Sequence, residues 1–219
     1  MRALFNYMEF VQGTIKGDIN YTELILPKNT TLGDSLEYSR DFVYLVMEGF
    51  VQTSLVQSPT CVNTIYSKGA FLNYFSLLDQ ETQPFLFKTI SDCVIYKYSM
   101  KDLHYFLAMF PENYGFQFFI MKDLAAHLYY RTQLISCASS DKLKVSFQNM
   151  ARLHGMALGR DKVIIPQTIQ APHIISYSSL SRSSGYKQLA LLKEKGIVRQ
   201  IEDQWIVHNH TLNNLCEKN

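Results

Sequence analysis

The sequence predicts an α+β chain with an N-terminal β barrel or sandwich, a long helix and a C-terminal winged helix-turn-helix. Short apolar runs separated by turn residues fill 20–99, which favours an all-β domain. An apolar heptad seam follows within 112–138, which favours a long helix. Residues 172–207 then fit a helix, a tight turn, a second helix and a hairpin, a combination typical of a DNA-reading unit.

The N-terminal strands are expected where β-branched and aromatic residues run between turn residues. Such runs lie at 23–26, 42–47, 50–56, 61–66, 85–90 and 93–98. Glu48 and Gly49 separate the second run from the third and predict a turn there. A short helix over 100–110 is expected to stop before Pro111, because proline cannot continue a helix.

The long helix over 112–138 carries apolar residues on two faces. One face, at alternating spacings of four and three, is a heptad seam made of Tyr114, Phe118, Met121, Ala125, Leu128, Thr132 and Ile135. The second face contains Phe116, Phe119, Ile120 and Leu124 and is expected to pack on the β domain. A helix with two apolar faces needs two partners, so we expect the seam to meet the same helix of a second subunit. One-sided packing in a monomer is the alternative.

The C-terminal unit is expected to begin with a polar break and a helix over 141–154, followed by a strand near 163–166. A helix over 172–177 and a tight turn over 178–180 come next, with Leu180 as the buried residue of the turn. Ser181 is a good N-cap for the second helix, which ends at Gly196.

The exposed face of that second helix is cationic and rich in hydroxyls, as reading a DNA major groove requires. Its expected DNA-binding residues are Ser181, Arg182, Ser183, Ser184, Tyr186 and Lys187. The strands 198–201 and 205–207 are expected to form the wing. Residues 1–138 carry a formal charge of −3 and residues 139–219 carry +5, so the basic excess lies where DNA phosphates are expected.

This C-terminal pattern resembles the Crp/Fnr family of transcription regulators. The family pattern of a Ser-Arg start, spaced leucines and a Gly-Ile-Val end is matched at Ser181, Arg182, Ser184, Lys187, Leu189, Leu192, Gly196, Ile197 and Val198. Two positions differ from the family. Gly185 replaces the usual valine, which is expected to weaken the helix and its packing by roughly 1 kcal/mol or more. Ser183 replaces an acidic base-reader, so the DNA half-site does not carry over.

The resemblance implies three parts: a cupin-like β-roll (jelly roll) sensor over 1–111, a dimerisation helix over 112–138 and a winged helix-turn-helix over 139–219. Residues 43–51 resemble the family's sensor hairpin, and 68–78 resemble the segment before its effector-binding loop. Between 69 and 90, however, the chain has neither the Gly-Glu pair nor the arginine that family members use to hold a cyclic nucleotide. We therefore expect that cyclic AMP is not the effector.

The corresponding space in the β-roll is expected to be filled by aromatic side chains or to take an unidentified, less polar small molecule. The candidate effector-pocket residues are Phe71, Tyr74, Phe75, Phe85 and Phe87. An aromatic roll without cyclic-nucleotide ligands is similar to the PrfA-like branch of the family. The resemblance implies that the protein is expected to be a homodimeric activator that binds a near-palindromic promoter site and contacts RNA polymerase.

The composition predicts no further cofactor. The four cysteines, Cys61, Cys93, Cys137 and Cys216, lack paired spacing, so neither an iron–sulfur cluster nor a zinc site is expected. The sequence contains no 18-residue uncharged apolar run, so we expect a cytoplasmic protein without a membrane span.

Two other functions compete with the regulator. The first is a non-enzymatic protein-interaction module that uses the long helix for a partner. The second is a cupin-like enzyme with a basic helical tail, for which a metal held by histidines is not expected because 1–100 contains none. We therefore predict that the protein is not an enzyme.

Overall fold

The computed structural model of the 219-residue chain divides it into two compact units. The described residues are 6–32, 41–74, 85–109, 111–159 and 161–208. The N-terminal unit comprises 1–59 and 64–126, and the C-terminal unit comprises 60–63 and 127–219. Among the described residues, no helix is both long and apolar enough to cross a bilayer.

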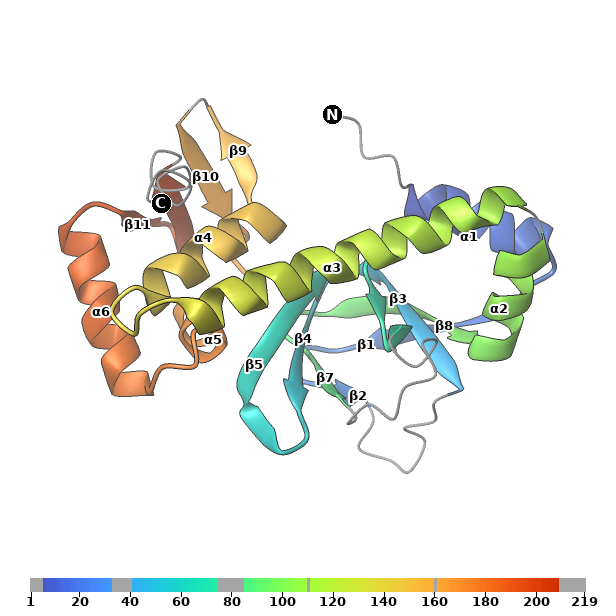
Figure 1. Ribbon diagram of the computed structural model, residues 1–219, viewed down its shortest axis with the longest axis horizontal. Coiled ribbons are helices and arrows are strands. Elements are labelled where there is room, and N and C mark those ends of the chain that lie inside the picture. The colour runs from blue at the N-terminus through green and yellow to red at the C-terminus, as the bar shows by residue number, and fades with distance from the viewer. Residues whose placement is uncertain (1–5, 33–40, 75–84, 110, 160, 209–219) are drawn as a thin grey trace. The chain divides into compact units, whose positions relative to one another are not determined.

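The N-terminal unit contains two four-stranded antiparallel sheets (Figure 1). One sheet has the order β1-β8-β3-β6 and the other has the order β2-β7-β4-β5. The strands are β1 (Tyr21–Leu26), β2 (Thr31–Leu32), β3 (Phe42–Glu48), β4 (Phe50–Leu55), β5 (Ser58–Ser67), β6 (Phe71–Leu72), β7 (Phe85–Thr89) and β8 (Cys93–Ser99). The strand expected at each of the six apolar runs is confirmed, and the two-residue strands β2 and β6 are additional.

The expected hairpin at residues 43–51 is wrong, because β3 and β4 lie in different sheets. Gly49, at φ +89°, turns the chain from one sheet to the other. A Cβ atom at Gly49 would lie 2.3 Å from the carbonyl oxygen of Asp92, so only glycine fits this corner. The turn residues were correctly located, but a turn dipeptide does not specify which sheet receives the next strand.

A helix that the strand pattern did not reveal, α1 (Tyr7–Lys16), precedes the first sheet. Asn6 caps it by accepting a hydrogen bond from the backbone N–H of Met8 at 3.0 Å. Phe10 is fully buried and meets Phe71 and Tyr98 edge to face, with ring centroids 5.1 and 5.9 Å apart. Aromatic pairs of this geometry stabilise a core beyond the area they bury.

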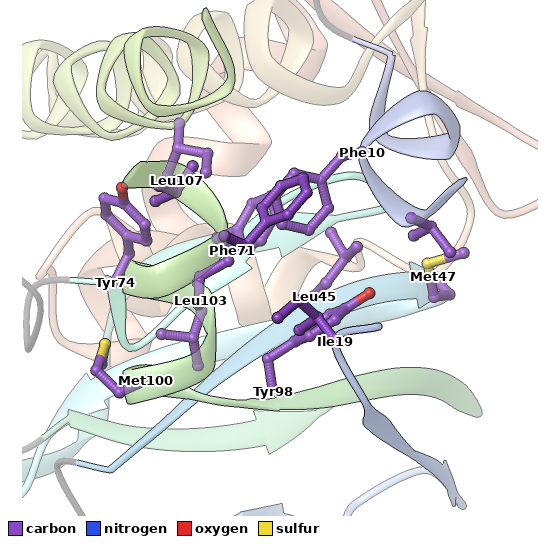
Figure 2. Packing of buried hydrophobic residues seen from close by; sticks show 14 of the residues in the cluster. Phe10, Ile19, Leu45, Met47, Phe71, Tyr74, Tyr98, Met100, Leu103 and Leu107 are labelled. Carbon is purple, nitrogen blue, oxygen red and sulfur yellow. The ribbon is translucent and has the colours of Figure 1, made fainter. Parts of the chain in front are cut away.

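This core cluster is shown in Figure 2, where Phe10 lies among side chains from the sheet and from the next helix. That helix is α2 (Met100–Met109), which contributes Leu103 and Phe106 to the cluster. It agrees with the expected helix at 100–110.

The long helix α3 (Tyr114–Ser136) follows the short 3₁₀ turn η2 (Pro111–Asn113). Ile120 and Leu124 of its inward face are buried in the same core cluster as Phe10, and Phe116 packs against it. These residues belong to the face that we expected to meet the β domain. The last turns of α3, from His127 onward, belong to the C-terminal unit, where Leu134 is 1% exposed.

Within its described residues, the C-terminal unit combines the last turns of α3 and three further helices with a four-stranded antiparallel sheet of order β11-β12-β10-β9. Its elements after α3 are α4 (Lys142–His154), β9 (Met156–Leu158), β10 (Lys162–Ile165), α5 (Ala171–Tyr177), α6 (Arg182–Glu194), β11 (Val198–Ile201) and β12 (Gln204–His208). Trp205 of β12 is buried against Phe147 of α4, with ring centroids 5.1 Å apart. Every helix and strand expected in this region is present, and β9 is additional.

Candidate nucleic-acid interface

The helix α6 is held by α5 and by the tight turn between them. The hydroxyl of the N-cap residue Ser181 accepts from the backbone N–H of Ser184 at 3.3 Å. Inside the turn, the Ser178 hydroxyl donates to the carbonyl oxygen of Ile175. Ser178 itself is completely buried, so its hydroxyl needs this hydrogen-bond partner.

The buried residue of the turn is not the one expected. Leu180 is only half-buried, whereas Tyr177 at the end of α5 is 1% exposed and fills the interior. The larger ring of Tyr177 buries more area than leucine, and burial raises the pKa of its phenol.

Gly185 has a packing role, so the expectation that it weakens the packing of α6 is wrong. It is buried in the middle of the contact between α5 and α6. A Cβ atom at this position would lie 2.4 Å from Cγ2 of Ile175. The family's usual valine would not fit against Ile175, and glycine lets the two helices approach each other closely.

All six residues expected to bind DNA are exposed on α6 and its cap. The Arg182 guanidinium carbon lies 6.0 Å from the ring centroid of Tyr186, one helical turn away. The Ser181 hydroxyl donates to the Ser184 hydroxyl at 3.0 Å, which leaves the proton of Ser184 for another acceptor. This end of α6 therefore presents a cation and hydroxyl donors at a helix N-terminus, where the backbone dipole also favours an anion.

The hairpin of β11 and β12 follows α6 directly and closes at Ile201 and Gln204. Its two turn residues, Glu202 and Asp203, both have positive φ, as the tight turns of two-residue hairpins require. Lys193 of α6 donates to the Gln200 side-chain oxygen at 3.2 Å. The hairpin is thus attached to the helix whose exposed face is the candidate interface.

The heptad seam of α3 lies on an exposed face within this single chain. Leu128 is 64% exposed, Phe118 63% and Ile135 68%, and the other four seam residues are also exposed. Exposed large apolar residues that recur along one helix face are typical of an association surface.

The candidate effector-pocket residues do not come together. Phe71 and Tyr74 are buried in the cluster of Figure 2, while Phe87 is buried in a second cluster with Phe85 packed against it. Phe75 lies outside the described residues. The four described side chains are components of the packed core.

Comparison with solved structures shows extensive similarity in fold. The chain superposes on a cyclic nucleotide-binding domain containing protein from Listeria monocytogenes with a TM-score of 0.78, at 15% identity, over 95% of this chain and 100% of that one. It superposes on a mutant of CooA from Carboxydothermus hydrogenoformans with a TM-score of 0.74, at 16% identity, over 98% and 96% of the two chains. A CRP/FNR-family transcriptional regulator from Thermus thermophilus gives 0.59, at 14% identity, over 90% and 99%.

The chain has the Crp/Fnr fold. Neither a protein-family model nor a curated protein sequence matches it. The resemblance found in the sequence is therefore confirmed at the level of fold. Within the described residues, no group of three or more His, Cys, Asp or Glu side chains is placed to hold a metal ion.

One residue of this Crp/Fnr fold stands out in the structure but not in the sequence. Arg131, near the end of α3, donates to the carbonyl oxygen of Tyr177 at 2.6 Å and to the Ser179 hydroxyl at 3.0 Å. The sequence offers no local signal for this contact, because the partners lie 46 and 48 residues further along the chain.

Proposed function

We propose that the protein is a homodimeric, sequence-specific DNA-binding transcription regulator that uses a winged helix-turn-helix. The observation that carries this proposal is the exposed cationic and hydroxyl-rich start of α6. The helix α5, a tight turn, α6 and the β11–β12 hairpin follow one another in the order of a winged helix-turn-helix. The fold shared with the Crp/Fnr regulators supports the same conclusion.

In this proposal α6 enters the major groove with its N-terminal residues toward the bases. Arg182 is the base reader, because a guanidinium can donate two parallel hydrogen bonds to a guanine edge. Lys187, Ser181, Ser184 and Tyr186 contact phosphates, and Ser183 is near enough to the helix start to touch a base. The β11–β12 hairpin follows the DNA backbone as the wing.

The exposed seam of α3 forms the dimer. Pairing two such helices buries the apolar side chains that are exposed in one chain. This burial stabilises the dimer by about 25 cal/mol for each Å² of apolar surface removed from water. A two-fold dimer presents its recognition helices about 34 Å apart, one helical turn of DNA, and so suits a near-palindromic promoter site.

The effector, where one acts, is proposed not to be cyclic AMP. Residues 69–90 contain no arginine and no Gly-Glu pair. The side chains of Phe71, Tyr74 and Phe87 are buried in the packed core. By its resemblance to the PrfA-like branch, we further propose an activator that contacts RNA polymerase, and we propose no enzymatic activity. Mass spectrometry of ligands that copurify with the native protein, followed by calorimetry with cyclic AMP, tests the effector.

The experiment that tests DNA binding is a selection of bound fragments from random and genomic duplex pools. Enrichment of a motif with two related half-sites is expected. Recovery of no motif beyond the input would contradict the proposal, and a single unpaired half-site would contradict the dimer.

Arg182→Ala and Lys187→Ala separate the two kinds of contact on the enriched site. Arg182→Ala is expected to cost about 1–3 kcal/mol in binding and to relax the preference at one base position. Lys187→Ala is expected to weaken all sequences alike and to reduce the slope of log K against log salt by about 0.9. Fluorescence anisotropy titrations at several salt concentrations measure both. An unchanged base preference in Arg182→Ala would place the reading residue elsewhere on α6.

A further inference from the structure

The side chain of Arg131 connects α3 to the turn between α5 and α6. The guanidinium of Arg131 donates through Nη1 to the carbonyl oxygen of Tyr177 at 2.6 Å and through Nη2 to the hydroxyl of Ser179 at 3.0 Å. Its central carbon also lies 5.5 Å from the ring centroid of Tyr177, in the range of a cation–π contact. Nη2 also lies 4.0 Å from Sγ of Cys61.

Both acceptors lie in the turn that orients the recognition helix. Tyr177 is the last residue of α5, and the turn continues from it to Ser181, which caps α6. Ser179 has φ +57°, a backbone conformation that serine rarely adopts. A side-chain partner on Ser179 therefore acts at the least favourable backbone position of the turn.

The neighbouring residue of α3 is tied into the same unit. The Asn149 amide of α4 donates to the carbonyl oxygen of Tyr130 at 3.0 Å, and Leu134 one turn later is buried. The last turns of α3 thus provide a firm base for Arg131. The seam residues Leu128, Thr132 and Ile135 lie on the exposed side of the same turns.

We propose that Arg131 is a positioning residue for DNA binding. It fixes the turn, and with it the start of α6, to the helix whose exposed face forms the dimer. Charge-assisted hydrogen bonds are about twice as strong as neutral ones, and a planar guanidinium holds two acceptors at a fixed separation. The orientation of α6 relative to α3 of the same chain then depends on Arg131, a residue that does not itself contact DNA. This inference rests on the proposed function.

The test compares Arg131→Met, Arg131→Lys and Ser179→Ala in the full-length protein with the wild type. Anisotropy measures the affinity of each for the site that the wild type selects and for an unrelated duplex. Arg131→Met is expected to lose roughly tenfold or more in affinity for the selected site, with affinity for the unrelated duplex changed less than about twofold. Arg131→Lys and Ser179→Ala are expected to fall between, because each keeps part of the contact.

Lys101→Met is the matched control, since it also removes one positive charge, from an exposed position on α2. It is expected to bind both duplexes as the wild type does. Equal loss on both duplexes in Arg131→Met would make Arg131 a direct phosphate contact and overturn the inference. Wild-type affinity for the selected site in Arg131→Met or in Ser179→Ala would overturn it too.

Hydrogen exchange of the free protein separates this inference from the proposed function. Amides of 176–182 are expected to exchange faster in Arg131→Met and Ser179→Ala than in the wild type, with amides of α4 unchanged. Unchanged exchange in the turn would overturn the inference even when the protein binds DNA. Failure of the wild type to select any DNA would overturn the proposed function and leave this measurement of the turn standing.

Discussion

At the scale of single residues, the absence of one methyl group sets how closely α5 and α6 pack. The ideal Cβ position at Gly185 lies 2.4 Å from Cγ2 and 3.0 Å from Cγ1 of Ile175. Both atoms belong to a buried side chain, so neither moves without disturbing the core of the C-terminal unit. The family pattern suggested a loss at this position, whereas the structure shows a matched pair of residues.

Gly185→Ala is therefore expected to destabilise the protein although alanine is the better helix former. Overpacking costs about 1–3 kcal/mol, and the gain in helix propensity offsets at most about 1 kcal/mol of it. Chemical denaturation followed by circular dichroism measures the change in the free energy of unfolding.

Gly115→Ala serves as the control, because Gly115 also lies within a helix but has open space around its Cβ position. It is expected to raise the stability by up to about 1 kcal/mol. If both variants shift stability in the same direction, the close contact at Ile175 is not what requires glycine.

Residue-scale patterns predicted the chemistry of α6 but not its support. Ser181 as a cap and the exposed charges of Arg182 and Lys187 follow from local spacing, and the structure exposes all of these residues. The contacts of Arg131 and Ile175 join positions that become neighbours only after folding. No periodicity in the sequence marks such positions.

At the scale of elements, the pattern of α3 predicted which face packs on the N-terminal unit, while the partner of the other face stays a prediction. Ile120 and Leu124 are buried in the N-terminal unit, while Leu128 and Ile135 on the other face are exposed. The helix α1 shows the opposite case. Its buried residues Phe10, Val11 and Thr14 have helical spacing. The segment is short, however, and the clearer strand pattern that follows it gave no reason to expect a helix there.

Leu128→Lys is expected to convert the proposed dimer to a monomer without unfolding the chain. A charged side chain has no partner in a buried seam, whereas the same side chain in a separate chain remains in water. Sedimentation velocity at micromolar concentration measures the mass, and circular dichroism checks the fold.

Tyr105→Lys is the matched control for the seam. Tyr105 of α2 is also 64% exposed but lies outside α3, so this variant is expected to remain a dimer. A Leu128→Lys variant that sediments at the dimer mass would place the association surface on another element.

At the scale of the whole molecule, the chain forms two units whose division does not coincide with the end of α3. His127 and Leu134 are 7% and 1% exposed, and both belong to the C-terminal unit. Burial lowers the pKa of His127 to about 3, so its imidazole is neutral at physiological pH, as an interior position requires. The sequence suggested a domain boundary at the polar residues near 139, because Ser and Asp are common in loops. The division lies earlier because α3 is one continuous helix whose two ends pack in different units.

The C-terminal unit is therefore expected to need the last turns of α3 for its stability. A fragment of residues 127–208 is expected to melt at a higher temperature than one of residues 139–208. The shorter fragment loses the burial of Leu134, worth about 2–3 kcal/mol, and leaves Asn149 without the carbonyl oxygen of Tyr130. Thermal unfolding of the two fragments measures the difference. Equal melting temperatures would show that the unit is complete from residue 139.

At Ser179, selection for stability and selection for DNA binding are expected to favour different residues. Glycine there would relieve a left-handed backbone that costs serine on the order of 1 kcal/mol, and it would also remove the hydroxyl that Arg131 holds. A mutant library screened for heat resistance would enrich the glycine, while one screened for promoter occupancy would deplete it. In the proposed function, Ser179 is thus expected to lower the stability of the chain while keeping the recognition helix α6 in position.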